Sequence, residues 1–284
     1  MTRKLLSLYG LKWNPFLPDV PTEAIWAPAR IEHFAERVER MVPDGGFALL
    51  TGDPGAGKSV SLRLVAERVG RLPDVVVGVL TRPQSGVSDF YRELGHLFSV
   101  SLAPRNRWGG FRALRDKWQA HIDSTLLRPV LLIDEAQEVP PPVLCELRIL
   151  ASTNFDSHTL LTTVLAGDGR LVEKLQTDDL LPLASRVRAR LALPAVTPQE
   201  LLDFLRHALA KAGNARLMTA ELMQTLAEHA AGNPRVLCGM AADLLAAAAD
   251  RDLRQLDEKL YLEIFAPPTD DASAAKAARG RKTR

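Results

Sequence analysis

The sequence predicts an α/β fold built on a parallel sheet, followed by a small domain that contains only helices. Three observations lead to this prediction. Short apolar runs typical of buried strands alternate with helical patterns up to about residue 195. The first of these runs ends in a glycine-rich turn that leads into a helical pattern. After Pro194 the strand patterns stop, and only helix signals follow.

The strands that we expect in the first domain are short, apolar and bounded by turn residues. They are residues 47–51, 75–80, 130–133, 160–166 and 191–193. Helical spacing connects them, and we expect helices from the glycine-rich turn to residue 70, at 88–98 and at 112–126. Parallel strands need long crossover connections, which are usually helices. The alternation therefore indicates a parallel sheet.

The second domain begins with a strong helix-start signal. Thr197 and Glu200 form a capping box, with Pro198 at the first helical position. That helix is expected to run to about Lys211, before Gly213. Further helices are expected from 219 to 232, from 233 to 249 and at 256–265. We therefore expect an α/β domain at 1–195, a helical domain at 196–266 and a disordered basic tail at 267–284.

Composition narrows the class of protein. Of the 284 residues, 46% are hydrophobic and 25% charged, with a net charge of +2, which is ordinary for a globular protein and argues against wholesale disorder. Cys145 and Cys238 are too few for a disulfide scaffold. The six histidines form no metal-binding pattern. No apolar run is long enough to cross a membrane, and the N-terminus lacks a signal-peptide cleavage site. We expect a cytoplasmic protein without a membrane partner.

The glycine-rich turn matches the phosphate-loop pattern at every fixed position. Glycines in such a loop let consecutive backbone N–H groups surround a phosphate, and the following helix adds its dipole. We expect Lys58 to reach the β- and γ-phosphates of ATP and the Ser59 hydroxyl to bind Mg²⁺. The predicted nucleotide-binding residues of the loop are Gly52, Asp53, Pro54, Gly55, Ala56, Gly57, Lys58, Ser59 and Val60.

Two acidic residues follow the expected strand at 130–133. In a parallel sheet, their position after an apolar strand places them beside the phosphate loop. We expect Asp134 to hold the Mg²⁺ shell and Glu135 to orient and activate the attacking water. A strand that ends in two acids is weak evidence alone, but it is strong about eighty residues after a phosphate loop. The pair favours hydrolysis of ATP.

Together these motifs resemble those of the AAA+ ATPases, and in particular the group of ExeA/GspA-type and TnsC/TniB-type ATPases. Residues 9–16, YGLKWNPF, are similar to the segment that precedes the adenine pocket in that group, and residues 134–137, DEAQ, match its acidic motif. The resemblance covers nearly the whole chain. It implies a P-loop NTPase fold of the AAA+ type with a helical lid, and it places Asn14, Pro15 and Phe16 at the adenine.

The same resemblance suggests two further contacts with the nucleotide. Residues 165–168 resemble the strand end that carries the sensor 1 residue, which would be Asp168, although an acid differs from the Gln, Asn or Thr common in the group. Residues 232–235, GNPR, resemble the sensor 2 motif, which would bring Arg235 to the γ-phosphate.

Three arginines alternate before the last expected strand, at 186, 188 and 190. The family places there an arginine finger that completes the site of a neighbouring subunit and stabilises charge on the phosphates. Arg186 matches the family position best, and Arg190 is the alternative. A solvated charged face explains the same pattern. If the finger interpretation holds, the protein forms a homo-oligomeric ring or filament.

Residues 104–118 combine five basic residues with one acid and interleaved aromatic and glycine residues. This composition suits contacts with nucleic-acid phosphates together with ring stacking. A loop between two helices, with solvated arginines and Trp118 in the core, is the alternative. In TnsC-type regulators, which residues 82–86 also resemble, two such loops line a central channel. The resemblance implies duplex DNA contacts at Gln84, Ser85, Arg105 and Arg107.

Three functions remain compatible with these motifs. The first is an ATP-dependent DNA-binding regulator that assembles on target DNA and recruits or activates a transposase. The second is an ExeA/GspA-type secretion-assembly ATPase, whose members add a membrane span and a wall-binding domain after the lid. The chain shows no such span, which favours the first. The third is a helicase loader or another protein-remodelling ATPase. The motifs themselves report only the ATPase domain.

Overall fold

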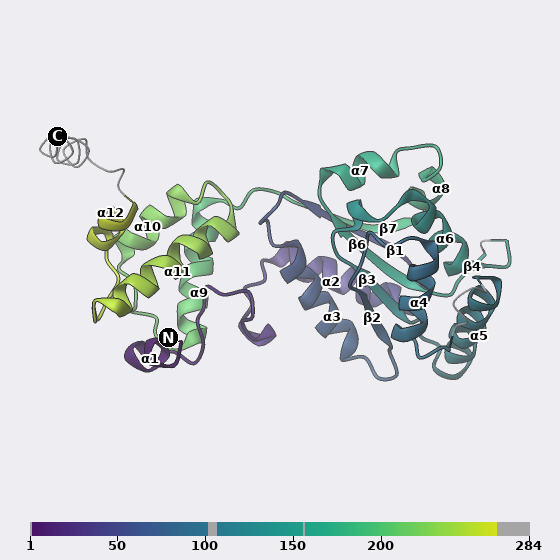
Figure 1. The fold of residues 1–284 in the computed structure, drawn as a ribbon, viewed down its shortest axis with the longest axis horizontal. Coiled ribbons are helices and arrows are strands. Elements are labelled where there is room, and N and C mark those ends of the chain that lie inside the picture. The colour runs from purple at the N-terminus through teal and green to yellow at the C-terminus, as the bar shows by residue number, and fades with distance from the viewer. Residues whose placement is uncertain (1, 102–106, 156, 266–284) are drawn as a thin grey trace, which may run out of the picture. The chain divides into compact units, whose positions relative to one another are not determined.

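The computed structural model describes residues 2–101, 107–155 and 157–265 (Figure 1). The chain divides into two compact units, residues 27–195 and the combination of residues 2–26 with the described residues from 196 on. The sequence analysis assigned the N-terminal segment to the α/β domain, whereas it packs with the helical unit. The reason is a set of apolar anchors, Tyr9, Leu11 and Phe16, which are buried in the core of the helical unit.

The α/β unit holds a five-stranded parallel sheet in the order β2-β3-β6-β1-β7. The strands are β1 (Gly46–Gly52), β2 (Val77–Leu80), β3 (Val130–Ile133), β6 (Thr162–Gly167) and β7 (Val187–Leu193). The short pair β4 (Ser152–Thr153) and β5 (His158–Thr159) is antiparallel and separate from this sheet. The predicted α/β fold of the P-loop type is confirmed.

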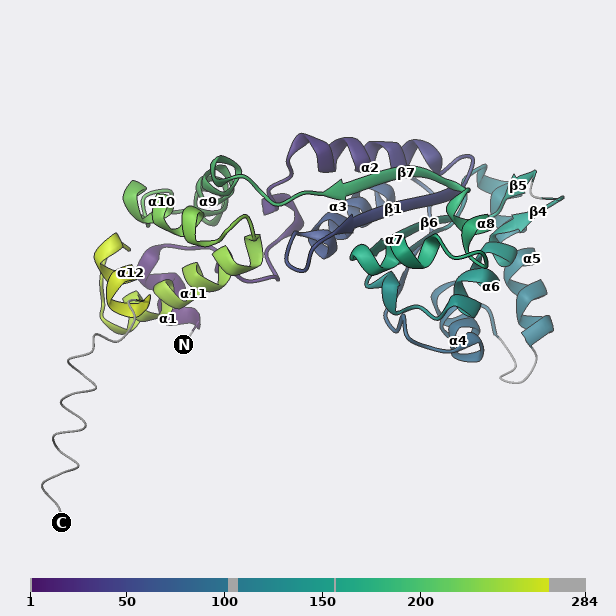
Figure 2. The same cartoon turned by 90° about the horizontal axis from the view of Figure 1, so that it is seen from above.

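Helices cover both faces of this sheet. The helices of the unit are α2 (Ala29–Met41), α3 (Lys58–Gly70), α4 (Val87–Leu97), α5 (Arg107–Thr125), α6 (Pro141–Ala151), α7 (Gly169–Leu175) and α8 (Leu181–Ala184). Successive side chains of a strand point to opposite faces. Ala48 and Leu50 therefore pack with residues of α2 and α3, while Phe47 and Leu49 pack with residues of α4 to α8. Figure 2 shows the sheet between these two groups of helices. The result is three layers with two apolar cores.

The helical unit contains α9 (Pro198–Ala212), α10 (Ala220–His229), α11 (Pro234–Asp250) and α12 (Glu258–Phe265), together with α1 (Thr2–Tyr9) and the short helix η1 (Thr22–Ala24). The predicted capping box is present: Thr197 Oγ1 accepts from the Glu200 N–H at 3.2 Å, and a Glu200 oxygen accepts from the Thr197 N–H at 3.0 Å. The N-terminal segment is tied to α9 by the His207 ring, whose Nε2 lies 3.1 Å from the Ala24 carbonyl oxygen.

Two sequence expectations fall beyond the described ranges. The basic tail at 267–284 and the predicted DNA contact Arg105 lie outside the described residues. Within the described residues, none of the helices combines the length and the apolar character that a membrane span requires.

Candidate nucleotide site

Three strand ends bring the predicted motifs to one edge of the sheet. The register aligns Leu49 of β1 with Leu165 of β6, and Leu165 with Ile133 of β3. The phosphate loop follows β1, and Asp134 follows β3, so both leave the sheet at its carboxyl edge. β6 lies between them, which separates β1 from β3 by two strand spacings, about 10 Å. In open parallel sheets this edge is where ligands bind.

The loop between β1 and α3 has the backbone of a phosphate cradle. Gly55 and Gly57 have φ angles of 88° and 98°, which a side chain would strain. A Cβ atom added at Gly57 would meet no heavy atom within 4 Å, so the space beside it is open. Gly57 is the N-cap of α3, and the helix N-terminus therefore points its free N–H groups into the loop.

Lys58 is the one buried charged residue of the loop, with 6% of its surface exposed. Its Nζ donates hydrogen bonds to the main-chain oxygens of Gly52, at 2.9 Å, and Asp53, at 3.2 Å. The lysine thus bends back across the loop that precedes it. Ser59, next in the first turn of α3, is exposed at the same edge, and Val60 is half-buried. This arrangement presents an ammonium, a hydroxyl and backbone N–H groups to an anion.

The two acids after β3 differ in exposure and conformation. Asp134 is half-buried, and its Oδ1 accepts a hydrogen bond from the Glu135 N–H at 2.9 Å. Glu135 is exposed, and its φ angle of 49° lies in the left-handed region, where residues other than glycine are uncommon. Such backbone strain is typical of functional sites. Glu135 therefore follows β3 directly, at the carboxyl edge of the sheet, in a strained backbone conformation.

The donor set suits a magnesium ion carried by a nucleotide. A hydroxyl from Ser59 and a carboxylate from Asp134 are hard oxygen ligands, which Mg²⁺ prefers. Across the part of the chain that the structure describes, no three His, Cys, Asp or Glu side chains gather into a metal cluster. Phosphate oxygens and water would therefore supply the remaining ligands, which is the usual arrangement for Mg²⁺ in nucleotide sites.

Asp168, predicted as the sensor 1 residue, lies one residue beyond β6 and caps α7. Its carboxylate accepts the Arg170 N–H at 2.9 Å and also binds the Arg170 guanidinium, with Nη2 to Oδ2 at 2.8 Å. The Arg170 guanidinium lowers the pKa of the Asp168 carboxyl below its usual value, and burial opposes this effect. Lys58 adds a smaller electrostatic contribution in the same direction.

The sequence predicted no role for Gln137, although this residue belongs to the DEAQ motif. Its side chain is buried between the ends of β3 and β6, and its amide contacts Glu135 and Asp168. Asp168 is 31 residues further along the chain, so spacing in the sequence gave no signal of this contact.

The preferred candidate arginine finger, Arg186, lies at the other end of the sheet, whereas Arg190 pairs with Leu49 in the middle of β1. β7 is parallel to β1, with Phe47 opposite Val187 and Gly52 opposite Leu193. Arg186 precedes β7 and therefore lies near the start of β1, whereas the phosphate loop follows its end. Five residues of strand separate the two edges by about 16 Å. Arg186 is thus remote from the phosphate loop of its own chain. Arg190 donates from Nη2 to the Ala184 carbonyl oxygen at 2.9 Å.

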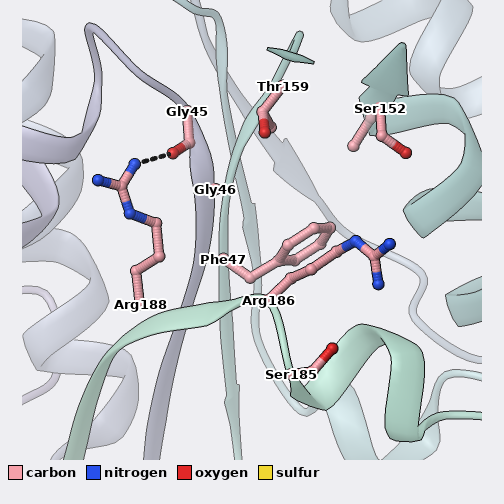
Figure 3. A pocket seen from close by; sticks show the side chains of 9 residues that line it. Gly45, Gly46, Phe47, Ser152, Thr159, Ser185, Arg186 and Arg188 are labelled. Atoms are coloured by element: carbon pink, nitrogen blue, oxygen red, sulfur yellow. Dashed lines mark hydrogen bonds between the residues drawn. The ribbon is translucent and has the colours of Figure 1, made fainter. Parts of the chain in front are cut away.

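A small cavity of about 190 Å³ opens beside these arginines (Figure 3). Arg186 and Arg188 line it together with Phe47, Ser152, Thr159 and Ser185. The Arg188 guanidinium points away from Arg186 and donates to the Gly45 carbonyl oxygen at 2.8 Å (Figure 3). The amino edge of the sheet therefore has a cavity that is lined in part by two arginine side chains.

The other predicted nucleotide contacts belong to the helical unit. Asn14 Oδ1 accepts the Phe16 N–H at 3.0 Å, and Pro15 and Phe16 are buried. Arg235 is exposed in the first turn of α11, where its N–H is bonded to Asn233 Oδ1 at 3.0 Å. Their assignment to the adenine and the γ-phosphate stays a prediction.

Of the predicted DNA contacts, Gln84, Ser85 and Arg107 lie among the residues that the structure describes. Gln84 is exposed and Ser85 half-buried in the loop between β2 and α4. Arg107 begins α5. Further along α5, the Trp108 and Phe111 rings stack 5.5 Å apart and nearly parallel, and the Arg115 guanidinium lies 5.0 Å from the Phe111 ring centre. Trp108 is 68% exposed, whereas Trp118 is buried in the core. Trp118 therefore takes the structural role that the alternative interpretation gave it.

A glycine-rich phosphate loop and an acidic strand end at one edge of a parallel sheet define a P-loop NTPase. Residues 42–175 match the AAA domain family, so this part of the chain is an AAA+ ATPase domain, and its cofactors are ATP and Mg²⁺. The chain is 30% identical over 234 residues to general secretion pathway protein A of Aeromonas hydrophila, a match that covers 81% of this chain and 42% of that protein. The chain therefore spans less than half of this relative.

Solved structures with the same fold are more distant in sequence. Cdc6p of Pyrobaculum aerophilum superposes with a TM-score of 0.66 at 15% identity, over 85% of this chain and 67% of that one. The ORC1 protein of Aeropyrum pernix, solved in complex with DNA, gives 0.64 at 19% identity, over 87% and 66%. Both likenesses concern the fold alone.

Proposed function

We propose that the protein hydrolyses ATP at the carboxyl edge of its sheet and uses this reaction to control an assembly on duplex DNA. The observation that supports ATP hydrolysis is the alignment of β1, β6 and β3, which brings the phosphate loop and the acidic pair to one edge of the sheet. Backbone N–H groups of residues 52–60 surround the phosphates, and Lys58 neutralises their charge. Ser59 and Asp134 hold Mg²⁺, which supplies charge stabilisation at the phosphates.

In this proposal Glu135 is the general base. Its exposed carboxylate accepts a proton from the attacking water, and the strained turn at φ 49° aims the side chain. The Glu135→Gln variant keeps the shape of the side chain and loses its basicity. We expect it to bind ATP with wild-type affinity and to lose turnover by roughly 100- to 10,000-fold. Phosphate release and binding of a fluorescent ATP analogue measure the two quantities. Wild-type turnover in this variant would remove Glu135 from the role.

Assembly into a ring or filament is the second part of the proposal. Arg186 lies at the edge opposite the phosphate loop of its own chain, so it reaches a nucleotide only in a neighbouring copy. There its guanidinium stabilises charge that develops on the phosphates. Asn14, Pro15 and Phe16 at the adenine and Arg235 at the γ-phosphate complete the proposed site. The molar mass of the protein in solution, compared with and without a non-hydrolysable ATP analogue, tests the assembly.

Duplex DNA is the proposed partner, and α5 supports it. Arg112 and Lys117 are exposed on this helix, beside the stacked pair of Trp108 and Phe111. Cationic side chains neutralise phosphates, and exposed rings stack on bases or enter a groove. This face of α5 supports a regulator of transposition that recruits or activates a transposase, and Gln84, Ser85, Arg105 and Arg107 are the contacts that the sequence predicts for it. Repetition of weak contacts around an assembly raises their combined affinity.

A secretion-assembly ATPase is the second candidate. The observation in its favour is the 30% identity to general secretion pathway protein A, which extends over 81% of this chain. More than half of that relative lies outside the match, and the 234 matched residues extend beyond the AAA domain at 42–175. In this case the exposed face of α5 would contact a protein instead of DNA.

One binding measurement separates the two candidates. A fluorescent 60-base-pair duplex is titrated with wild-type protein at low salt, with ADP and with a non-hydrolysable ATP analogue. A regulator that assembles on DNA should bind the duplex with the ATP analogue but not with ADP. Its affinity should change little with the sequence of the duplex. The Trp108→Ala variant should weaken this binding, whereas Phe155→Ala, at another exposed aromatic residue, should not. Without any affinity for DNA, the secretion-type function becomes the better supported.

A further inference from the structure

The DEAQ turn buries an amide that the reaction outlined above does not use. Gln137 lies in the short helix η2 (Ala136–Glu138), two residues after Glu135, and only 6% of its surface is exposed. Buried polar side chains need hydrogen-bond partners, because an unpaired one costs free energy. The partners of Gln137 are therefore informative about why an amide occupies this position.

Both ends of the Gln137 amide are used. Nε2 donates to the Oε2 atom of Glu135, and Oε1 accepts the Asp168 N–H at 3.3 Å. A carboxylate only accepts hydrogen bonds and a backbone N–H only donates them. The orientation of the amide is therefore fixed, and the side chain bridges the catalytic carboxylate to the residue that follows β6.

The surroundings hold this bridge in place. Lys174 of α7 donates from Nζ to the main-chain oxygens of Gln137 and, at 2.9 Å, of Val139. Gly167 leaves room for the amide, because a Cβ atom there would lie 2.6 Å from Gln137 Oε1. Contacts with the ends of β3 and β6 and with α7 therefore fix the position of Gln137.

We propose that Gln137 is a positioning residue that fixes the Glu135 carboxylate for the attack of water on ATP. The inference rests on the proposed role of Glu135. The hydrogen bond from Gln137 occupies Oε2 and leaves Oε1 to accept the proton. It also holds a side chain whose backbone is in a strained conformation. Because the amide is anchored to the end of β6, a shift of Gly167 and Asp168 at the phosphate edge moves the base.

The test is the Gln137→Met variant, which keeps the volume of the side chain and removes both hydrogen bonds. We expect the turnover number to fall by roughly 10- to 100-fold, with ATP affinity within twofold of wild type. The matched control is Gln224→Met on α10, where an exposed glutamine donates to Glu228 at 2.7 Å. The control should keep wild-type turnover. Wild-type turnover in Gln137→Met overturns the inference, and so does a parallel loss of ATP affinity and turnover.

A comparison of single and double variants separates positioning from a merely structural role. Single-turnover hydrolysis is measured for Glu135→Gln with and without Gln137→Met. If Gln137 acts through Glu135, the second substitution adds no further loss, because the base is already absent. A further loss of tenfold or more overturns the inference. Failure of the proposed function is distinguishable, since then Glu135→Gln alone retains wild-type turnover.

Discussion

The Nζ atom of Lys58 lies 2.9 Å from the main-chain oxygen of Gly52, six residues earlier. The ammonium group therefore bridges the start of the phosphate loop and the first turn of α3. Only 6% of the residue surface is exposed, so solvent screens its charge weakly. In the proposed site, Lys58 would therefore be held in position before the phosphates bind.

The Lys58→Ala variant should lose affinity for ATP. Hydrogen bonds to charged groups contribute about 1.5–3 kcal/mol each, so the dissociation constant should rise by about 10- to 100-fold. Equilibrium titration with a fluorescent ATP analogue measures this change. Lys211→Ala, on the exposed surface of α9, is the control and should bind normally. Unchanged affinity in Lys58→Ala would mean that the lysine does not contact phosphate.

The phosphate loop and the acidic pair could be predicted because their chemistry requires fixed residues at fixed local spacing. Gln137 could not, since its role depends on a contact with Asp168, which β6 brings near. The N-terminal segment was assigned to the wrong unit because apolar anchors such as Tyr9 and Phe16 do not specify which core they enter.

The extent of the strands and helices was also only partly predictable. β7 begins at Val187, before the expected residue 191, because Arg188 and Arg190 alternate with buried Ala189. Such alternation is typical of a strand with one exposed face. The helix α2 was not predicted, although Ile31, Phe34 and Val38 repeat at helical spacing and are buried.

The position of Arg186 leads to a complementation prediction. Arg186→Ala should bind ATP normally and hydrolyse it at least tenfold more slowly, because the charge it supplies is needed only as the phosphate is transferred. Mixing it with Glu135→Gln should partly restore turnover, since some interfaces then pair an intact Glu135 with an intact Arg186. Lack of restoration in proteins that co-assemble would shift the assignment to Arg190.

The contact between Asp168 and Arg170 predicts a structural role for the carboxylate. Asp168→Ala removes the N-cap of α7 and should destabilise the α/β unit by about 1 kcal/mol. Asp168→Asn retains a capping oxygen and should cost less. Because Arg170 lowers the pKa of Asp168, its ionised form stabilises the fold above the ordinary carboxyl pKa, and this contribution disappears as the pH falls through the lowered value. Urea unfolding from pH 6 down to pH 2 measures the difference.

That pair of variants also tests the sensor 1 assignment. Turnover is compared with stability for Asp168→Asn and Asp168→Ala. If the carboxylate senses the γ-phosphate, Asp168→Asn should lose turnover while its stability is nearly unchanged. A loss of activity that follows only the loss of stability would assign Asp168 to the cap alone.

Cys238 should react slowly with thiol reagents. Burial raises the pKa of this thiol to about 11, so at pH 8 only about 0.1% is thiolate. In a Cys145→Ser background, alkylation by iodoacetamide at pH 8 should be roughly 100-fold slower than in urea. Because the folded pKa is raised, stability should decline as the pH rises from about 9, where the unfolded thiol ionises, towards 11. Equal rates in folded and unfolded protein would contradict this burial.

The salt dependence of DNA binding tests the predicted phosphate contacts Arg105 and Arg107. Each phosphate contact that is lost should lower the slope of log affinity against log salt by roughly 0.9. The double variant Arg105→Ala with Arg107→Ala removes two cations, so the slope should flatten by about 1.8 for each subunit that contacts DNA. Binding should weaken for every duplex sequence, because contacts with phosphates carry no base information. ATP hydrolysis without DNA should stay near the wild-type rate.

The matched control for this pair is Arg40→Ala with Arg71→Ala. It makes the same change in charge at two exposed arginines, Arg40 in α2 and Arg71 just after α3, each paired with a glutamate one turn away. If Arg105 and Arg107 contact DNA, the control should keep the wild-type slope while the test pair flattens it. Equal flattening in both variants would instead point to a general effect of net charge. In that case Arg105 and Arg107 would not be phosphate contacts, and Trp108, Arg112 and Lys117 of α5 would have to provide the contacts with DNA.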